Sequence, residues 1–267
     1  MIMKRTIWWV LLFVILGSST AVYYYSQQSL QQSVPPPPSH AVAPSAPSPV
    51  TGPAIRHPLE TGPARSLPVL GDSDVAMREA LAGLFGKKSL TEFFYTDLMI
   101  RRVVATIDNL PRKKAPVRMM PVKPVPRPFA RLGKADNTVI SPGNSARYAA
   151  YVRIAQAVDA PNLVDTYIRF YPLLQRAYEE LGFPKGYFND RLIETLDDLL
   201  DAPGIKGPIK LAQPKVMYEF ADPALEARSA GQKIMIRMGN ENAAKVKAKL
   251  REIRHEVTRR EPKLNRP

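Results

Sequence analysis

Residues 187–204, with the sequence YFNDRLIETLDDLLDAPG, contain the pattern that most clearly decides how this chain folds. On a helix, at about 100° per residue, the acidic side chains of this stretch fall on one face. Leucine and isoleucine side chains fill the opposite face, which predicts an amphipathic helix with its apolar face in a core. Pro203 and Gly204 are expected to end the helix. The acidic face consists of Asp190, Glu194, Asp197, Asp198 and Asp201.

Three interpretations of this acidic face remain open. Like charges one turn apart repel each other, and acidic groups are disfavoured at the C-terminal end of a helix. The face is therefore a solvated surface, a partner for basic helices of the same chain, or a docking site for another protein or a divalent cation. Residues 245–260 offer basic helical side chains within the chain itself.

The composition narrows the classes of partner and of chemistry. The chain has 267 residues and a formal net charge of +14, so an anionic partner is the first expectation: nucleic acid, a membrane surface or an acidic polymer. It contains no cysteine, which excludes disulfides, thiol catalysis and thiolate metal sites. The histidines do not cluster, so the sequence predicts no metal site and no cofactor.

Residues 1–26, MIMKRTIWWVLLFVILGSSTAVYYYS, have the pattern of a membrane anchor. Residues 7–25 as a helix would span about 28 Å, close to the hydrocarbon thickness of a bilayer. Aromatic side chains lie near both ends of this uncharged run, and cations precede it. We expect a cytoplasmic N-terminus at residues 1–5 and a transmembrane helix at 6–26. The defining residues are Lys4, Arg5, Trp8, Trp9, Tyr23, Tyr24 and Tyr25.

A cleaved signal peptide is the alternative interpretation of this segment. Ser19, Thr20 and Ala21 form an acceptable cleavage site. Both interpretations export everything that follows residue 26. In a bacterium with two membranes, we expect the anchor in the inner membrane and the main domain in the periplasm, where nucleic acid is not an expected partner.

Composition and periodicity divide the rest of the chain. Residues 27–70 are rich in proline, alanine and serine and are expected to form a flexible linker. Residues 71–258 have helical periodicity and predict a mainly α, compact multi-helix domain with a minor extended or short β element. Residues 259–267 are expected to be a flexible tail.

The helical domain contains several start and stop signals. Helical patterns cover residues 73–86, 89–110, 141–159, 160–182, 222–239 and 241–260, in addition to the acidic helix. Ser89 and Glu92 have the spacing of a capping box. Pro172 is expected to kink or restart the helix that contains it. The small residues 229–231 predict a close approach of another element, and 129–132 with 138–140 predict a short strand pair.

The segment 112–134, RKKAPVRMMPVKPVPRPFARLGK, holds eight basic residues and no acidic residue. Its prolines forbid a helix, so an irregular, extended segment is expected. This charge density makes it the candidate surface for anionic lipid or an anionic polymer. The residues that we assign to this surface are Lys113, Lys114, Arg118, Lys123 and Arg127.

The sequence lacks the common catalytic motifs, including G-x-S-x-G, H-E-x-x-H and the phosphate-binding loop. One enzyme class remains as an alternative, because glycoside cleavage needs only two carboxylates, one of them kept protonated by burial. The chain would then be a peptidoglycan-cleaving or modifying enzyme. Exposed carboxylates one turn apart stay ionised, which argues against this alternative. Its candidate residues are Glu179, Glu180, Asp190, Glu194 and Asp197.

Five stretches of the chain resemble a known bacterial envelope family. They are RRVVATIDNLPR, RYAAYVRIAQAVD, YPLLQRAYEELGFPKGYFNDRL, GPIKLAQPKVMYEFADPALEARSAGQKIMIRMG and NAAKVKAKLREIR, in the family's order. The family is domain of unknown function 3014, and the resemblance covers about residues 67–254. It implies a membrane-anchored envelope protein and carries no catalytic residue to this chain.

Together these patterns predict a non-enzymatic binding or scaffold module of the cell envelope. The expected partners are the membrane, through the N-terminal helix, and another envelope protein, anionic lipid or peptidoglycan. No cofactor, metal or nucleic acid is expected.

Overall fold

The computed structural model describes residues 54–60, 67–134 and 137–262. Residues 51–267 form one compact unit. The predicted cytoplasmic residues 1–5, the predicted anchor at 6–26 and most of the predicted linker lie outside the described residues. Among the described residues, no helix combines the length and the apolar character needed to cross a bilayer.

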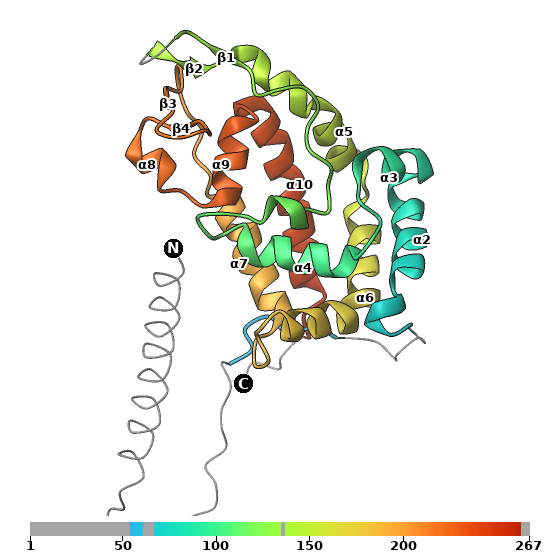
Figure 1. Ribbon diagram of the computed structural model, residues 1–267. Coiled ribbons are helices and arrows are strands. Elements are labelled where there is room, and N and C mark those ends of the chain that lie inside the picture. The colour runs from blue at the N-terminus through green and yellow to red at the C-terminus, as the bar shows by residue number, and fades with distance from the viewer. Residues whose placement is uncertain (1–53, 61–66, 135–136, 263–267) are drawn as a thin grey trace, which may run out of the picture. The chain divides into compact units, whose positions relative to one another are not determined.

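The domain is mainly helical, as the sequence predicts, with two very small antiparallel sheets (Figure 1). The helices are α2 (Asp74–Phe85), α3 (Lys87–Phe93), α4 (Met99–Asn109), α5 (Ala149–Ala157), α6 (Ala160–Glu180), α7 (Phe188–Leu200), α8 (Pro223–Glu226), α9 (Ala230–Arg237) and α10 (Asn240–Arg259). Short 3-10 helices cover Leu70–Asp72, Val117–Met119 and Pro142–Tyr148. The strands are β1 (Arg131–Leu132), β2 (Val139–Ile140), β3 (Leu211–Ala212) and β4 (Glu219–Phe220).

Helix α10 lies in the middle of the domain, and α5, α6 and α7 pack against it (Figure 1). Helix α4 crosses α6 and α7. Phe170 of α6 and Phe188 of α7 are fully buried in the main core. Ile193 and Leu196 join them, so the apolar face of the acidic helix packs in the core as predicted. Burial of such side chains contributes about 1.5–3 kcal/mol each to folding.

The predicted helix at 89–110 is wrong, because the chain forms two helices there. Helix α3 ends at Phe93, and α4 begins at Met99 after Leu98, whose φ is 50°. Asp74, at the start of α2, accepts hydrogen bonds from the backbone N–H groups of Leu98 and Met99 at 2.7 and 3.1 Å. This long-range carboxylate satisfies the free donors of α4, so the break depends on a tertiary contact. The predicted Ser89–Glu92 capping box does not form, since α3 starts at Lys87 with no side-chain cap.

The predicted helix at 222–239 also divides into two. Asp222 caps α8 as predicted, accepting from the Ala224 N–H at 2.8 Å. Ser229 then starts α9, accepting from the Gln232 N–H at 3.0 Å.

The small residues 229–231 make the close approach that the sequence predicts. The N–H of Gly231 donates to the carbonyl of Leu110 at 2.9 Å. A Cβ at Gly231 would lie 2.5 Å from a methyl group of Leu199, closer than real Cβ contacts. Helix α9 therefore packs directly on the end of α4 and on α7.

Pro172 lies inside α6, which continues from Ala160 to Glu180 without restarting. Proline cannot donate a backbone hydrogen bond, so packing holds this helix together. Its neighbours Phe170, Tyr171, Leu173 and Leu174 are all buried. In the predicted helix at 141–159, the first part is a 3-10 helix, and α5 starts only at Ala149.

The predicted strand pair at 129–132 and 138–140 forms a hairpin, and a second hairpin follows α7. Strand β1 pairs with β2, and β3 pairs with β4, each antiparallel. Phe220 and Leu211 pack with Ile236 of α9 in a separate small core. Figure 1 shows the four strands and α8 together at one end of the domain, away from α2.

Part of the segment that the sequence assigns to the linker contacts the helical domain. Leu59 is buried in the main core, and its N–H donates to the hydroxyl of Tyr187 at 2.9 Å. The carbonyl of His57 accepts from the buried amide of Asn189 at 2.8 Å.

Candidate functional site

The acidic face of α7 makes several separate contacts within the domain. Asp190, at its N-terminal end, accepts hydrogen bonds from the backbone N–H groups of Arg56 and His57. The shortest of these, from His57, is 2.8 Å. This carboxylate therefore holds residues 56 and 57 against the start of α7, where the positive end of the helix dipole also favours it.

Glu194 belongs to an ion-pair network between α4 and α7. Arg191 Nη1 lies 2.8 Å from Glu194 Oε1, and Arg191 Nε lies 3.2 Å from Asp108 Oδ1. Arg112 Nη2 contacts the same Asp108 at 2.9 Å. The Asp108 side chain is only 4% exposed and that of Arg191 is 14% exposed. Two guanidinium groups thus neutralise a buried carboxylate that the sequence analysis did not single out.

Asp197 pairs with the central helix. Arg254 of α10 contacts both oxygens of Asp197 through Nε and Nη2, at 2.5 and 3.1 Å. Two parallel N–H···O bonds are the strong geometry for an arginine and a carboxylate. The pKa of Arg254 is raised by this hydrogen bond. Pairing with the chain's own basic helix, one of the three interpretations of the acidic face, therefore describes this residue.

Asp198 faces α9. Its carboxylate accepts from the Ser229 hydroxyl at 2.7 Å and from the Gln232 amide at 3.1 Å. Partial burial raises the pKa of Asp198, and the Ser229 hydrogen bond opposes that rise. Asp201 is exposed at the end of the helix, near Lys247, whose ammonium donates to the Ala202 carbonyl at 2.6 Å.

These contacts separate the five acidic residues by function. Asp190, Asp197 and Asp198 each contact a different element, Glu194 pairs with Arg191 of the same helix, and Asp201 faces solvent. The described residues include no group of three or more His, Asp or Glu side chains suited to hold a metal ion.

The basic segment 112–134 is irregular, as predicted, and other arginines hold its backbone. Arg102 Nη1 donates to the Arg118 carbonyl at 2.7 Å. Arg147 Nη2 donates to the carbonyl of Arg127, whose φ is 64°, at 2.7 Å. The side chains of Arg118 and Arg127 lie at the surface, with those of Lys113 and Lys114.

Lys123 differs from the other members of the predicted basic surface. Its ammonium donates to the Thr91 carbonyl at 2.7 Å, near the C-terminal end of α3. A cation is favoured there by the helix dipole. The hydroxyl of Tyr151 donates to the carbonyl of Lys123 at 2.9 Å. Lys123 therefore joins the segment to α3 and α5.

Two further carboxylates of the enzyme alternative, Glu179 and Glu180, lie at the end of α6. Arg101 contacts Glu180 at 2.7 Å, and Arg176 contacts it at 3.1 Å. The hydrogen bond from Arg101 lowers the pKa of Glu180. Gln175 donates to Glu179 at 3.1 Å. A general acid needs a raised pKa, and the arginine contacts of Glu180 have the opposite effect.

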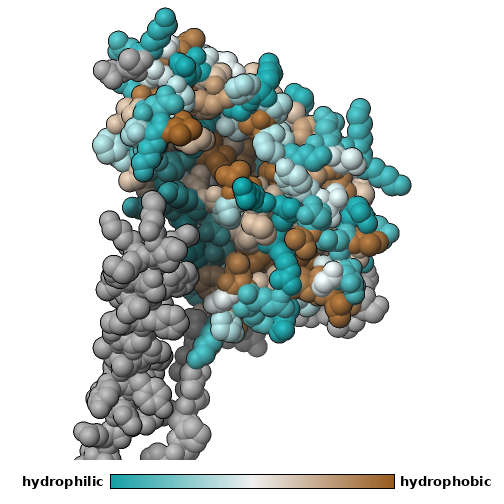
Figure 2. Space-filling model, viewed as in Figure 1, coloured by the Kyte–Doolittle hydropathy of each residue, from teal (hydrophilic) through white to brown (hydrophobic). Residues whose placement is uncertain are grey.

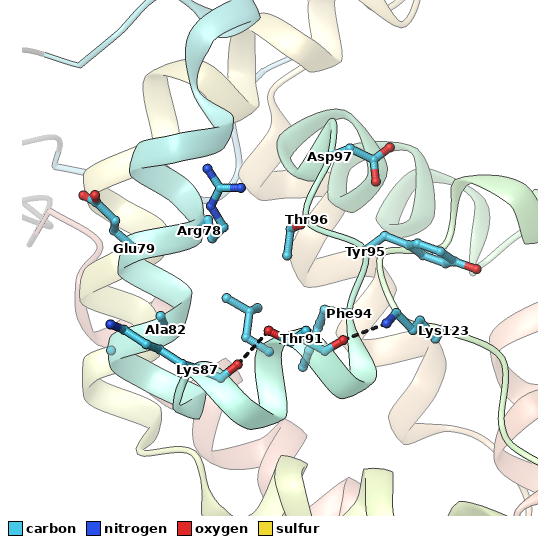
Figure 3. A pocket seen from close by; sticks show the side chains of 12 residues that line it. Arg78, Glu79, Ala82, Lys87, Thr91, Phe94, Tyr95, Thr96, Asp97 and Lys123 are labelled. Atoms are coloured by element: carbon cyan, nitrogen blue, oxygen red, sulfur yellow. Dashed lines mark hydrogen bonds between the residues drawn. The ribbon is translucent and has the colours of Figure 1, made fainter.

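A hollow of about 850 Å³ lies between α2, α3 and the segment that joins α3 to α4 (Figure 3). Arg78 and Glu79 line it from α2, while Thr96 and Asp97 lie across the space. Lys123 closes one side through its bond to Thr91. The walls thus carry both signs of charge around an apolar floor that includes Leu90 and Phe94. The lining residues are Arg78, Glu79, Ala82, Gly83, Lys87, Leu90, Thr91, Phe94, Tyr95, Thr96, Asp97 and Lys123.

Helical periodicity does not reveal this hollow, because it predicts one helix over residues 89–110. The run of aromatic and β-branched residues at 93–96, FFYT, favours extended backbone and was the available signal. Phe94 and Val122 form an isolated antiparallel bridge there. The hydrogen bond from Arg102 lowers the pKa of Asp97, whose carboxylate lies 2.8 Å from that guanidinium.

The family model described as "Protein of unknown function (DUF3014)" matches residues 99–254, more than half of the chain. The chain belongs to this family, which confirms the resemblance. The match includes α7 and both hairpins but not α2 and α3, which form two walls of the hollow. No curated protein and no solved structure matches the chain significantly.

Proposed function

We propose that this protein is a non-enzymatic binding module of the bacterial cell envelope. In this proposal residues 6–26 anchor the chain in the inner membrane, and the helical domain lies in the periplasm. The observation that carries the binding role is the open hollow between α2 and α3, with cations and carboxylates around an apolar floor. Its volume of about 850 Å³ lies in the range of ligand-binding clefts.

The lining of the hollow favours an extended peptide segment of another envelope protein. A peptide backbone offers both donors and acceptors, and the walls offer Arg78 and Lys87 as donors with Glu79 and Asp97 as acceptors. Leu90 and Phe94 provide apolar surface for a side chain. Such a mixture of a small apolar centre and a charged rim is the usual anatomy of a protein–protein contact.

The carboxylates of the acidic helix support a binding role over glycan cleavage. Retaining and inverting glycosidases need one carboxyl group that remains protonated near neutral pH. Glu194 contacts Arg191 at 2.8 Å and Asp197 contacts Arg254 at 2.5 Å, so arginine side chains of the domain already occupy both carboxylates. Asp198 has a raised pKa, but Ser229 and Gln232 already bind its carboxylate.

Site-specific crosslinking in intact cells tests the binding role. A photoreactive amino acid at Thr96, in the wall of the hollow, should capture a protein partner. The same amino acid at Leu181, an exposed position at the end of α6, is the matched control. Arg78→Glu with Lys87→Glu should abolish the Thr96 product without changing the level of the protein. Capture of peptidoglycan or lipid alone at Thr96 would overturn the proposed protein partner.

A topology reporter tests the proposed location independently. A reporter that is active only outside the cytoplasm is fused after residue 70, and we expect it to be active. Deletion of residues 1–26 should abolish that activity. Activity of a cytoplasm-specific reporter at the same position would contradict the location and leave the crosslinking result intact.

A further inference from the structure

The strand pairing places the tips of the two hairpins at the same end of the domain. Val139 bridges to Lys210 in the antiparallel direction, and Leu211 donates to the carbonyl of Thr138 at 2.8 Å. Strand β2 therefore runs inward from its turn while β3 runs outward towards its own turn. The isolated bridge thus places the two small sheets side by side, with both hairpins leaving it in the same direction.

Large apolar side chains are exposed at these turns. In the turn after β3, Val216 is 85% exposed and Met217 is 75% exposed. Leu132, the last residue of β1, is 53% exposed. Apolar side chains gathered at a projecting edge mark an interaction surface more often than isolated ones do. Figure 2 shows hydrophobic and hydrophilic side chains next to one another at this end.

Cations accompany the apolar side chains. Arg131 and Lys134 line a hollow of about 610 Å³ between the two hairpins. Lys215 lies in the same turn as Val216 and Met217. Among the residues that the structure describes, no salt bridge involves these three cations. The described acidic residue of the hairpins is Glu219, at the inner side of the second turn.

Aromatic contacts join the two hairpins to each other and to the domain. Phe129 stacks on Tyr218 with ring centroids 6.2 Å apart, and the Arg131 guanidinium lies 5.3 Å from the Tyr218 ring. Phe220 packs with Ile236 of α9 beneath the ribbon. The two turns therefore do not depend on a partner to stay together.

We infer that this hairpin end, defined by Arg131, Leu132, Lys134, Lys215, Val216 and Met217, docks on the surface of an anionic phospholipid bilayer. Val216, Met217 and Leu132 enter the interface between headgroups and acyl chains. Arg131 and Lys134 receive a lipid phosphate in the hollow between the hairpins. Apolar side chains flanked by cations are the combination that binds anionic membrane surfaces, and a soluble phosphate compound would leave the apolar side chains unused.

This inference deepens the proposed envelope function and rests on it, because the proposed anchor at residues 6–26 would bring the domain to a bilayer. An anchored domain meets the bilayer at a high effective concentration, so a weak surface contact is sufficient to orient it. Helices α2 and α3, which line the other hollow, lie away from the four strands in Figure 1, so that hollow would remain free of the hairpin end's bilayer contact.

Lipid-quenching fluorescence of the full chain tests the inference. The chain has no cysteine, so Met217→Cys gives a single labelling site for a fluorophore. The labelled chain is placed in nanodiscs that contain a spin-labelled quencher lipid, with either phosphatidylglycerol or only phosphatidylcholine. We expect strong quenching in the anionic nanodiscs and little in the neutral ones. Val75→Cys, an exposed position on α2, is the matched control and should remain unquenched.

Charge-reversal variants and a soluble competitor show whether the quenching depends on the cations and on the bilayer. Lys134→Glu with Lys215→Glu should abolish the quenching at position 217, and added glycerol phosphate should leave it unchanged. Equal quenching at positions 217 and 75, or none at 217, would overturn the docking inference. If the chain fails to elute with the nanodiscs, the proposed anchor fails instead. Anionic vesicles added to the same labelled chain then decide the docking inference, since quenching at 217 supports it and absence of quenching overturns it.

Discussion

The acidic face of α7 and the hairpin end are both charged surfaces, but the domain uses them in opposite ways. Along α7, Asp190, Asp197 and Asp198 each accept hydrogen bonds from a different neighbouring element. At the hairpin end, Lys134 and Lys215 have no described carboxylate partner and stand beside exposed apolar side chains. Most carboxylates of the acidic face thus bind other parts of the domain, whereas the cations of the hairpin end remain available to bind a partner.

The difference teaches that the charge of a segment does not indicate whether its residues are functional. An acidic side chain that contacts free backbone N–H groups or arginines stabilises the folded state more than one in water does, because the low local dielectric strengthens the electrostatic attraction. A cation at a projecting turn gains no such contact. Burial and neighbouring groups therefore decide whether a charged side chain stabilises the fold or remains free at the surface. Four sets of substitutions test that conclusion.

The largest effect is expected from Asp108→Ala. This carboxylate is 4% exposed and contacts Arg191 of α7 and Arg112. Removing one partner from a buried ion pair leaves the other charge uncompensated and costs about 3–5 kcal/mol. Urea unfolding of residues 51–267 measures the free energy of unfolding. Glu241→Ala, which removes an exposed partner of the exposed Lys245, should leave the unfolding midpoint almost unchanged, and equal losses for both variants would contradict the comparison.

A smaller, local effect is expected from Asp190→Ala. The variant removes the hydrogen bonds that hold residues 56 and 57 against α7. Hydrogen bonds to a charged group contribute about 1.5–3 kcal/mol, so trypsin should cleave after Arg56 at least about tenfold faster. Glu194→Ala is the control and should not change this cleavage. An unchanged rate in Asp190→Ala would show that the core contact of Leu59 alone holds the segment.

The third effect is a pH dependence at Asp198. Burial raises its pKa in the folded state, so the folded chain binds this proton more tightly than the unfolded chain. Stability from this group is therefore greatest at low pH and falls as the pH rises above the ordinary aspartate range. The difference in unfolding free energy between wild type and Asp198→Asn should decrease across that window and then become constant. A difference that increases with pH would contradict the assignment.

The smallest effect on stability is expected at the hairpin end. Val216→Ser with Met217→Ser replaces side chains that contact solvent, so the free energy of unfolding should change by less than about 0.5 kcal/mol. The same variant should lose the lipid quenching of a label placed at Leu132→Cys. A large loss of stability would show that these side chains pack in the domain and would remove the basis for docking.

The helices that the sequence predicts well are those with a complete local signal. Helix α7 combines a leucine face with a proline–glycine stop, and α10 follows Gly239. The end of α7 and the start of α10 both depend on residues that are only a few positions away in the sequence. The two divided helices were missed because their breaks depend on distant groups, Asp74 for α4 and the packing of Gly231 on Leu110 for α9.

Among the site residues, the sequence identified every acidic side chain of α7 and the basic segment 112–134. It could not assign their partners, and it overlooked Asp108, because a single aspartate in the apolar pattern of α4 carries no periodic signal. The hollow between α2 and α3 could not be predicted from the sequence either, since its walls come from three separate segments.

By itself the sequence determined the mainly helical class and the apolar face of the acidic helix, because these follow from periodicity along the chain, and its motifs carry the resemblance to the family. Only the tertiary structure decided which charges pair, where helices break and which end of the domain exposes cations beside apolar side chains. The physical reason is that desolvation and hydrogen-bond partners come from residues remote in sequence. Asp197 and Arg254 meet across 57 positions, and no local pattern records that contact.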